Sequence, residues 1–223
     1  MCGRFAIDIE KPIFVKRFNV LQMEIQLKPN YNVAPGEFLP TVIRKSPNKA
    51  VLMKWGLIPH WSREPKTKFS TINARMETIE SSPVYRMPFY KQRCLIPAIG
   101  FYEWAKVSDG TKSPYFFNLK NQSMFVFAGL WDVWKDVEGK EFPSCTIITC
   151  PANSIVGKIH PRMPVILEEA DEDLWLSDSQ DNYQLISLLK PYAEGAMEGY
   201  RVSTRVNNPR NIDKEVIEKY SEK

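Results

Sequence analysis

The pattern of apolar and polar positions along the chain is more typical of β-strands than of helices. Most apolar runs are short, are rich in β-branched and aromatic residues, and end at proline, glycine or polar clusters. Pro97 and Gly100 interrupt one of these runs, which should nevertheless be buried. We predict strands at 38–45, 50–58, 92–104, 114–119, 124–133 and 142–150.

Helical spacing is found near the two ends of the chain. Apolar residues recur at this spacing over 11–25, which predicts an amphipathic helix. Two further helices are expected within 168–192, where Asp173 and Asp181 suit first-turn positions. A short charged helix is expected over 211–223.

Prolines and glycines mark the loops. The segment 29–36 contains two prolines and a glycine and is expected to be irregular, and 58–68 forms a second, basic loop. We expect 71–77 to be extended, which puts Asn73 and Arg75 on one face. Because strands dominate and no repeat or linker is found, the pattern predicts an α+β fold in a single domain over residues 1–223.

Composition restricts the class of protein only slightly. The 223 residues are 43% hydrophobic and 25% charged, as in ordinary globular proteins, and a net charge of +4 permits a polyanionic partner without requiring one. No apolar run approaches the ~20 residues that span a bilayer. Arg4 and Asp8 stand where a signal peptide needs apolar residues. We therefore expect a cytoplasmic protein that does not bind membranes, in a reducing compartment.

Cysteine and histidine are too few and too widely spaced for a zinc site. The histidines are His60 and His160, and no C-x-x-C pair occurs. We expect no metal and no cofactor, and we expect the three internal cysteines, Cys94, Cys145 and Cys150, to be small buried residues.

Cys2 is the residue with the most distinctive chemistry. If Met1 is removed, Cys2 carries an amine and a thiol on adjacent carbons, which ordinarily titrate near ~7.7–8.0 and ~8.5. We expect Arg4 to lower both pKa values. Such an aminothiol captures an aldehyde as a Schiff base and then a thiazolidine, or it attacks an amide as an N-terminal nucleophile. The alternative is an unremarkable residue in a frayed terminus.

Two further residues suit proton transfer. Glu103 is the one carboxylate in the apolar run 92–104, so burial should raise its pKa toward neutrality; a structural ion pair is the alternative. His160 precedes a proline and suits a general acid or base, or else a hydrogen-bonded structural role.

Other side chains suit binding rather than proton transfer. Asn73 and Arg75 could hydrogen-bond a phosphate or a sugar, or they could lie on a solvated edge. Trp61 and Pro35 could form a platform for a nucleobase, although a tryptophan more often packs in the core.

Several short motifs occur together in an order that one family shows, and the chain resembles the SOS response-associated peptidase (SRAP) family. Its animal member is named for binding hydroxymethylcytosine. The resemblance runs from residue 1 to about residue 210. The motifs are Met1-Cys2-Gly3-Arg4-Phe5, Tyr31-Asn32-Val33-Ala34-Pro35, Trp55-Gly56, Ile72-Asn73-Ala74-Arg75 with Glu77-Thr78, Gly100-Phe101-Tyr102-Glu103-Trp104 and His160-x-Arg162-Met163-Pro164.

The resemblance implies a fold and a reaction. The fold would have mostly antiparallel strands in a curved, barrel-like core with flanking helices. The protein would remove its own Met1 and capture abasic sites in single-stranded DNA as a stable thiazolidine crosslink, as part of the DNA damage response. Cys2 would be the nucleophile, His160 would help to open the sugar, Glu103 would shuttle protons, and Asn73 would orient the Cys2 amine.

The resemblance also implies a DNA-binding set and a monomeric protein. Ser62 stands where family members can carry a second aromatic residue, and His60 stands where a small residue can occur, so His60 is left out of the catalytic set. The residues expected to bind DNA are Arg4, Asn32, Pro35, Trp61, Arg75 and Arg162.

Two rival functions remain open from the sequence. An N-terminal-nucleophile amidohydrolase or peptidase would use the Cys2 amine and would need neither Arg75 nor Trp61. A non-catalytic binder of single-stranded or modified DNA would not need Cys2.

Overall fold

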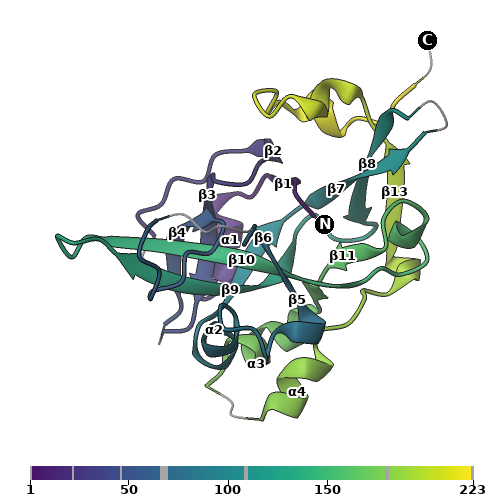
Figure 1. Cartoon of the computed structure of the whole chain (residues 1–223). Coiled ribbons are helices and arrows are strands. Elements are labelled where there is room, and N and C mark those ends of the chain that lie inside the picture. Colours follow the sequence, from purple (N-terminus) through teal and green to yellow (C-terminus); the bar gives the residue numbers. More distant parts are fainter. Residues whose placement is uncertain are drawn as a thin grey trace.

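A computed structural model describes residues 2–21, 23–45, 47–65, 70–107, 110–178 and 181–221. These residues form two β-sheets with short helices at the periphery (Figure 1). The predicted α+β fold with mostly antiparallel strands in a single domain is confirmed.

The larger sheet closes on itself. Its strands pair in the circular order β10, β4, β3, β6, β9 and back to β10, and only the β10–β4 pairing in this circle is parallel. The predicted barrel-like core is therefore present. The strands of the circle are β3 (Phe38–Ile43), β4 (Lys49–Trp55), β6 (Arg93–Ala98), β9 (Phe125–Lys135) and β10 (Glu141–Pro151).

Three short strands extend this sheet outside the circle. β5 (Asn73–Arg75) runs parallel to β10, β11 (Arg162–Pro164) runs antiparallel to β10, and β12 (Ile166–Leu167) pairs with β9. Since β5 and β11 both pair with β10, residues far apart in the sequence are brought to the same strand.

The smaller sheet contains the N-terminus. Its order is β13-β8-β7-β1-β2, so that β1 lies between β2 and β7. Figure 1 shows the N-terminal end near the middle of the molecule, beside β1 and β7. The strands are β1 (Phe5–Ile7), β2 (Asn30–Val33), β7 (Gly100–Lys106), β8 (Lys112–Leu119) and β13 (Met197–Arg201).

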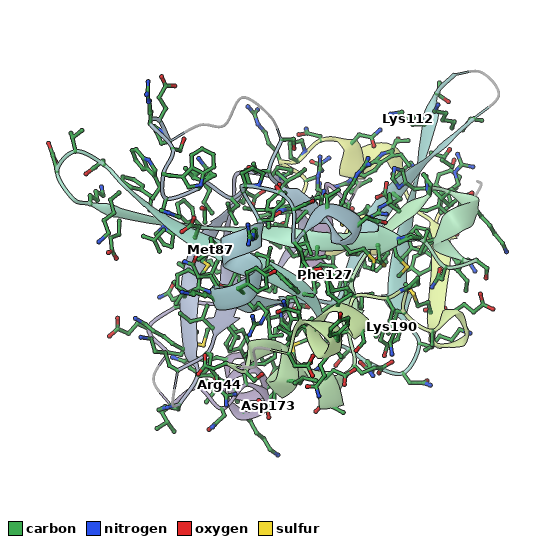
Figure 2. The ribbon with its side chains drawn as sticks, turned by 60° about the horizontal axis from the view of Figure 1, so that its bottom comes forward. Arg44, Met87, Lys112, Phe127, Asp173 and Lys190 are labelled. Carbon is green, nitrogen blue, oxygen red and sulfur yellow. The ribbon has the colours of Figure 1, made fainter. Side chains whose placement is uncertain are left out.

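Aromatic rings join the two sheets. The ring of Phe5 meets Trp55 at 5.1 Å and Phe127 at 5.5 Å between centroids, both edge to face. All three side chains are buried, and Phe127 lies in the middle of the molecule (Figure 2). Burying a phenylalanine stabilises a fold by roughly 1.5–3 kcal/mol, and edge-to-face pairs add to this. Phe5 therefore anchors the N-terminal residues in the core.

Helix α3 covers one side of the barrel. Trp175 of this helix donates its indole N–H to the Cys94 carbonyl, and Arg93 donates to the Trp175 carbonyl at 2.7 Å. At its start, Asp173 pairs with Arg44 at 3.8 Å, and both are labelled at the lower edge of Figure 2. The α-helices are α1 (Lys11–Arg17), α2 (Arg86–Lys91), α3 (Glu172–Leu176) and α4 (Asn182–Ser187).

Single turns of 3₁₀ helix complete the chain. They connect strands and cap helices rather than forming a layer of their own. They are η1 (Met76–Thr78), η2 (Val156–Lys158), η3 (Glu169–Asp171), η4 (Glu194–Ala196), η5 (Thr204–Asn207) and η6 (Lys214–Ile217).

Three local predictions were wrong. The helix expected over 11–25 ends at Arg17, because Asn19 adopts a left-handed conformation (φ 49°) that terminates the helix. The segment 29–36 contains strand β2, because its prolines lie outside the four residues that pair with β1. In the described part of the charged tail, up to residue 221, the single turn η6 forms instead of the expected helix, with Asp213 accepting the N–H of Glu215.

The expected strands and acidic first-turn positions agree better with the structure. All the predicted strand runs contain strands, and the run over 92–104 divides into β6 and β7 at Ile99. Asp173 lies in the first turn of α3, and Asp181 caps α4 by accepting two backbone N–H groups. The extended conformation predicted over 71–77 is limited to β5, since η1 begins at Met76.

The Gly100→Ala variant should be destabilised by about 1–3 kcal/mol, because its Cβ would lie 2.1 Å from the buried ring of Phe116. Gly195→Ala is the matched control, since a Cβ there meets nothing within 4 Å, and its effect should stay within about 0.5 kcal/mol. Urea unfolding measures both. Equal stability of the two variants would show that the β7–β8 contact is looser than described.

Candidate active site

Cys2 lies just before β1 and is fully buried. Its Sγ lies 3.8 Å from the Arg4 carbonyl, and the next strand residue, Phe5, is held in the aromatic core. Met1 lies outside the described residues, so the predicted removal of Met1 concerns a residue on which the structure gives no information. A fully buried Cys2 is not the frayed terminus considered as an alternative.

Asn73 holds the backbone of Cys2. The Asn73 side-chain Nδ2 donates to the Cys2 carbonyl at 2.8 Å, across 71 residues of sequence. Asn73 is itself fixed by the pairing of β5 with β10 and by the Tyr85 hydroxyl, which donates to the Asn73 carbonyl at 3.2 Å. In the described part of the structure, its buried Oδ1 accepts no hydrogen bond. The site therefore has a fixed acceptor beside the Cys2 backbone.

Glu103 and His160 lie opposite each other. Glu103, on β7, is 4% exposed, and one of its carboxylate oxygens lies 3.8 Å from Nδ1 of His160. His160 follows η2, and its Nδ1 lies 3.1 Å from both the backbone N–H and the carbonyl of Arg162. The imidazole is about a quarter exposed, so it is accessible from outside the site.

Burial controls the titration of the two inner groups. It raises the pKa of the Cys2 thiol well above its ordinary range, and the nearby Glu103 carboxylate raises it further. A hydrogen bond to the Arg4 backbone lowers this pKa, which is the direction predicted for Arg4, but burial outweighs it and the predicted net lowering is not found. Burial also raises the pKa of Glu103, and His160 opposes that shift. The Cys2 thiol is therefore uncharged at pH 7, and the Glu103 carboxyl is protonated more readily than an exposed carboxyl group.

The two arginines near this site differ in what surrounds them. The Arg162 guanidinium pairs with both carboxylate oxygens of Glu77 and donates to the Thr149 carbonyl at 2.6 Å. The hydrogen bond from Arg162 to Glu77 holds the pKa of the Glu77 carboxyl below its ordinary value. Arg75 is exposed and forms no hydrogen bond or ion pair with any residue in the described ranges. Of these two arginines, Arg75 is the one whose guanidinium is available for a phosphate.

Asn32 is not accessible from outside the protein. It is fully buried, its Nδ2 donates to three backbone carbonyls of the 206–211 segment, and its Oδ1 accepts from Arg4 at 2.6 Å. A buried Asn32 cannot make the direct contact with DNA that was predicted for it. Its side chain instead holds the guanidinium of Arg4 in place. The Arg4 guanidinium also donates to the Val206 carbonyl and lies 5.9 Å above the Trp104 ring.

Trp61 and Pro35 are both exposed, Trp61 at 55%. The Trp61 loop is anchored at His60, whose backbone N–H and Nδ1 both contact the buried carboxylate of Asp132. The same loop begins where the Leu57 N–H donates to the Thr71 carbonyl, two residues before Asn73. An exposed tryptophan thus lies on an anchored loop that starts near the site.

Three residues that position this site had no predicted role, although Glu77 belongs to one of the family motifs. Asp132 could have been found, because it is a carboxylate in an apolar run, which is the signal that singled out Glu103. Glu77 and Tyr85 act through contacts across the fold, with Arg162 and with the Asn73 backbone, and their sequence neighbourhoods carry no sign of these contacts.

The described residues include no group of His, Cys, Asp and Glu side chains arranged to hold a metal ion. Within the same ranges, no helix is long and apolar enough to cross a bilayer.

Comparison with known proteins connects this site to a family. A family model described as SOS response associated peptidase (SRAP) matches residues 1–209. The abasic site processing protein YoqW of Bacillus subtilis is 42% identical over 224 residues, covering 99% of this chain and 100% of that protein. The abasic site processing protein HMCES of Gallus gallus is 32% identical, covering 87% of this chain and 67% of its own length.

A solved structure shows the same fold. The crystal structure of a protein from Bacteroides thetaiotaomicron superposes with a TM-score of 0.89 at 27% identity, over 99% of this chain and 100% of that one. Together with the family match, this confirms the resemblance seen in the sequence. The chain belongs to the SOS response associated peptidase family.

Proposed function

We propose that this protein recognises abasic sites in single-stranded DNA and captures their ring-opened aldehyde on Cys2. The observation that carries the proposal is the environment of the buried Cys2. Asn73 holds the Cys2 carbonyl, and the Cys2 thiol interacts electrostatically with Glu103, which in turn pairs with His160. The abasic site processing names of its relatives agree with this chemistry. An aldehyde is the natural partner of a 1,2-aminothiol, and an abasic deoxyribose supplies one.

The first step requires the α-amine of Cys2, which becomes available when Met1 is removed by the protein itself. The buried Oδ1 of Asn73 is a suitable acceptor for that amine, since its Nδ2 already fixes the Cys2 carbonyl. The amine attacks the aldehyde carbon, a C–N bond forms, and water leaves to give an imine. The Asn73 contact directs the nitrogen lone pair toward the incoming carbon.

The second step closes the thiazolidine. The Cys2 thiol is neutral because burial raises its pKa, so its proton must be removed as the C–S bond forms. Glu103 is the nearby base, and its raised pKa suits a group that takes the proton and returns it to the imine nitrogen. The same transfers in the opposite direction would reverse the crosslink.

His160 acts at the sugar. Opening the deoxyribose ring moves a proton between the ring oxygen and the anomeric hydroxyl, which suits an imidazole at the edge of the site. His160 is partly exposed, whereas Glu103 beside it is buried, so the two groups are placed for different steps.

Arg75 and Trp61 make the DNA contacts in this proposal. Arg75 presents an exposed guanidinium two residues after Asn73, and Trp61 with Pro35 presents exposed rings to a flanking base. Arg4 lies beside the site with part of its guanidinium held by Asn32 and Val206. Arg162 is assigned to Glu77 rather than to a phosphate.

The Cys2→Ala variant should form no heat-stable adduct with an abasic single-stranded oligonucleotide, and Cys2→Ser should form at most a labile one. The reason is that alanine has no second nucleophile and an oxazolidine opens more readily than a thiazolidine. Denaturing gels after heating measure the adduct. Cys145→Ala, which removes a buried thiol elsewhere, is the control and should react like the wild type. An undiminished adduct from Cys2→Ala would refute the proposal.

The Glu103→Gln variant should slow both formation and reversal of the crosslink by about 10²–10⁴-fold, the usual contribution of a positioned acid or base. Single-turnover crosslinking and pulse–chase release measure the two rates. The exposed Glu141→Gln is the control and should change neither.

The same variant should be more stable than the wild type at pH 7.5. Since burial raises the pKa of Glu103 in the folded protein, its carboxyl favours folding below about pH 4.3 and loses this contribution as the pH rises through the raised pKa. The stability gain of Glu103→Gln should therefore vanish at low pH. A variant with wild-type rates and lower stability at pH 7.5 would identify Glu103 as a structural ion-pair partner.

A further inference from the structure

A buried aspartate and an exposed histidine form a pair outside the four-residue site. Asp132, on β9, is 3% exposed, and its Oδ2 lies 2.9 Å from Nδ1 of His60. The same oxygen accepts the backbone N–H of His60 at 2.8 Å, and Oδ1 accepts the N–H of Val133 at 2.8 Å. The carboxylate is thus satisfied largely by the loop that carries Trp61.

This loop is held on both sides of Trp61. Before it, the Ile58 N–H donates to the Ser144 hydroxyl at 2.8 Å. After it, the Ser62 carbonyl accepts the indole N–H of Trp134 at 2.7 Å. With the Asp132 contacts between them, these bonds fix the loop without involving the indole of Trp61 itself.

The contact with Asp132 also determines which ring nitrogen of His60 is available to another molecule. Because Nδ1 is directed at Asp132, Nε2 is the nitrogen left to contact another molecule, and the imidazole is 56% exposed. A neutral imidazole with its proton on Nδ1 has only a lone pair at Nε2, whereas an imidazolium has an N–H there. The buried carboxylate keeps the imidazole in one orientation.

We propose that His60 is a phosphate-binding residue, which donates from Nε2 to the DNA backbone next to the base that stacks on Trp61. Asp132 is its positioning residue. This inference rests on the proposed function, and it adds a contact that is present in the protonated state of His60 and absent in the neutral one.

Within the described ranges, one charged side chain contacts the His60 imidazole. Asp132 is the charged neighbour from β9, while Ser144 on β10 and Gln92 after α2, which also contact Asp132, are neutral. Arg63 and Glu64 follow in the same loop and are exposed. Arginine, aspartate and glutamate side chains ordinarily keep their charge between pH 5.5 and 8.5. A pH dependence of the DNA affinity in that window that requires His60 therefore reports on its imidazole.

The test is the affinity for a single-stranded oligonucleotide carrying a tetrahydrofuran abasic analogue, which has no aldehyde and cannot crosslink. Fluorescence anisotropy from pH 5.5 to 8.5 compares the wild type with His60→Gln. The affinity ratio should be close to one at pH 8.5 and about two- to fivefold at pH 5.5. At pH 5.5 the variant should lose about 0.7 from the log–log salt slope, the share of one phosphate on a single strand.

Two further variants make the test specific. Arg75→Ala should weaken binding equally at every pH, because a guanidinium keeps its charge. Asp132→Asn should reduce the pH-dependent part of the affinity, and if it does not fold, His60→Gln still decides. His160 is present in both the wild type and His60→Gln, so its contribution cancels in their affinity ratio.

The outcomes separate this inference from the proposed function. An affinity ratio for His60→Gln that stays flat with pH and an unchanged salt slope would overturn the phosphate role of His60. If Arg75→Ala also bound as tightly as the wild type, the DNA-binding face itself would be wrong. A flat ratio with a weakened Arg75→Ala would refute the role of His60 alone.

Discussion

The edge-to-face contacts of Phe5 with Trp55 and Phe127 hold the N-terminus inside the molecule, and the candidate site depends on them. Phe5 is the first residue of β1, so its burial fixes the chain three residues back, where Cys2 lies. N-terminal residues usually fray, and a nucleophile there would lack a defined position. Here the closed barrel supplies two of the three rings, so that the fold and the placement of Cys2 share one core.

The same burial sets the chemistry. Burial raises the pKa of both the Cys2 thiol and the Glu103 carboxyl, so that each group holds its proton more tightly than it would in water. A surface cysteine would be more reactive toward any electrophile. In the proposed reaction, a buried thiol next to a proton acceptor reacts mainly with an aldehyde that is brought to it, and we propose that Asn73 and His160 help to receive that aldehyde.

The sequence predicted the parts of this account that are local. Glu103 stood out as a carboxylate in an apolar run, and the strands followed from β-branched and aromatic runs. Partners far apart in the sequence were not predictable: Arg162 shows no sign of its pairing with Glu77 until β11 and η1 meet around β10. The family resemblance implied that Asn32 binds DNA, because a sequence motif does not show that three backbone carbonyls surround its side chain.

The central claim is that Cys2, exposed by removal of Met1, forms the covalent bond to the lesion. The most direct measurement is the intact mass of the covalent product formed by the wild-type protein with an abasic oligonucleotide of defined mass. The account predicts the chain beginning at Cys2 plus the oligonucleotide minus one water, since imine formation releases one water and ring closure releases none. A covalent product that retains Met1 would contradict this claim, and so would a protein whose mass is unchanged after incubation with the oligonucleotide.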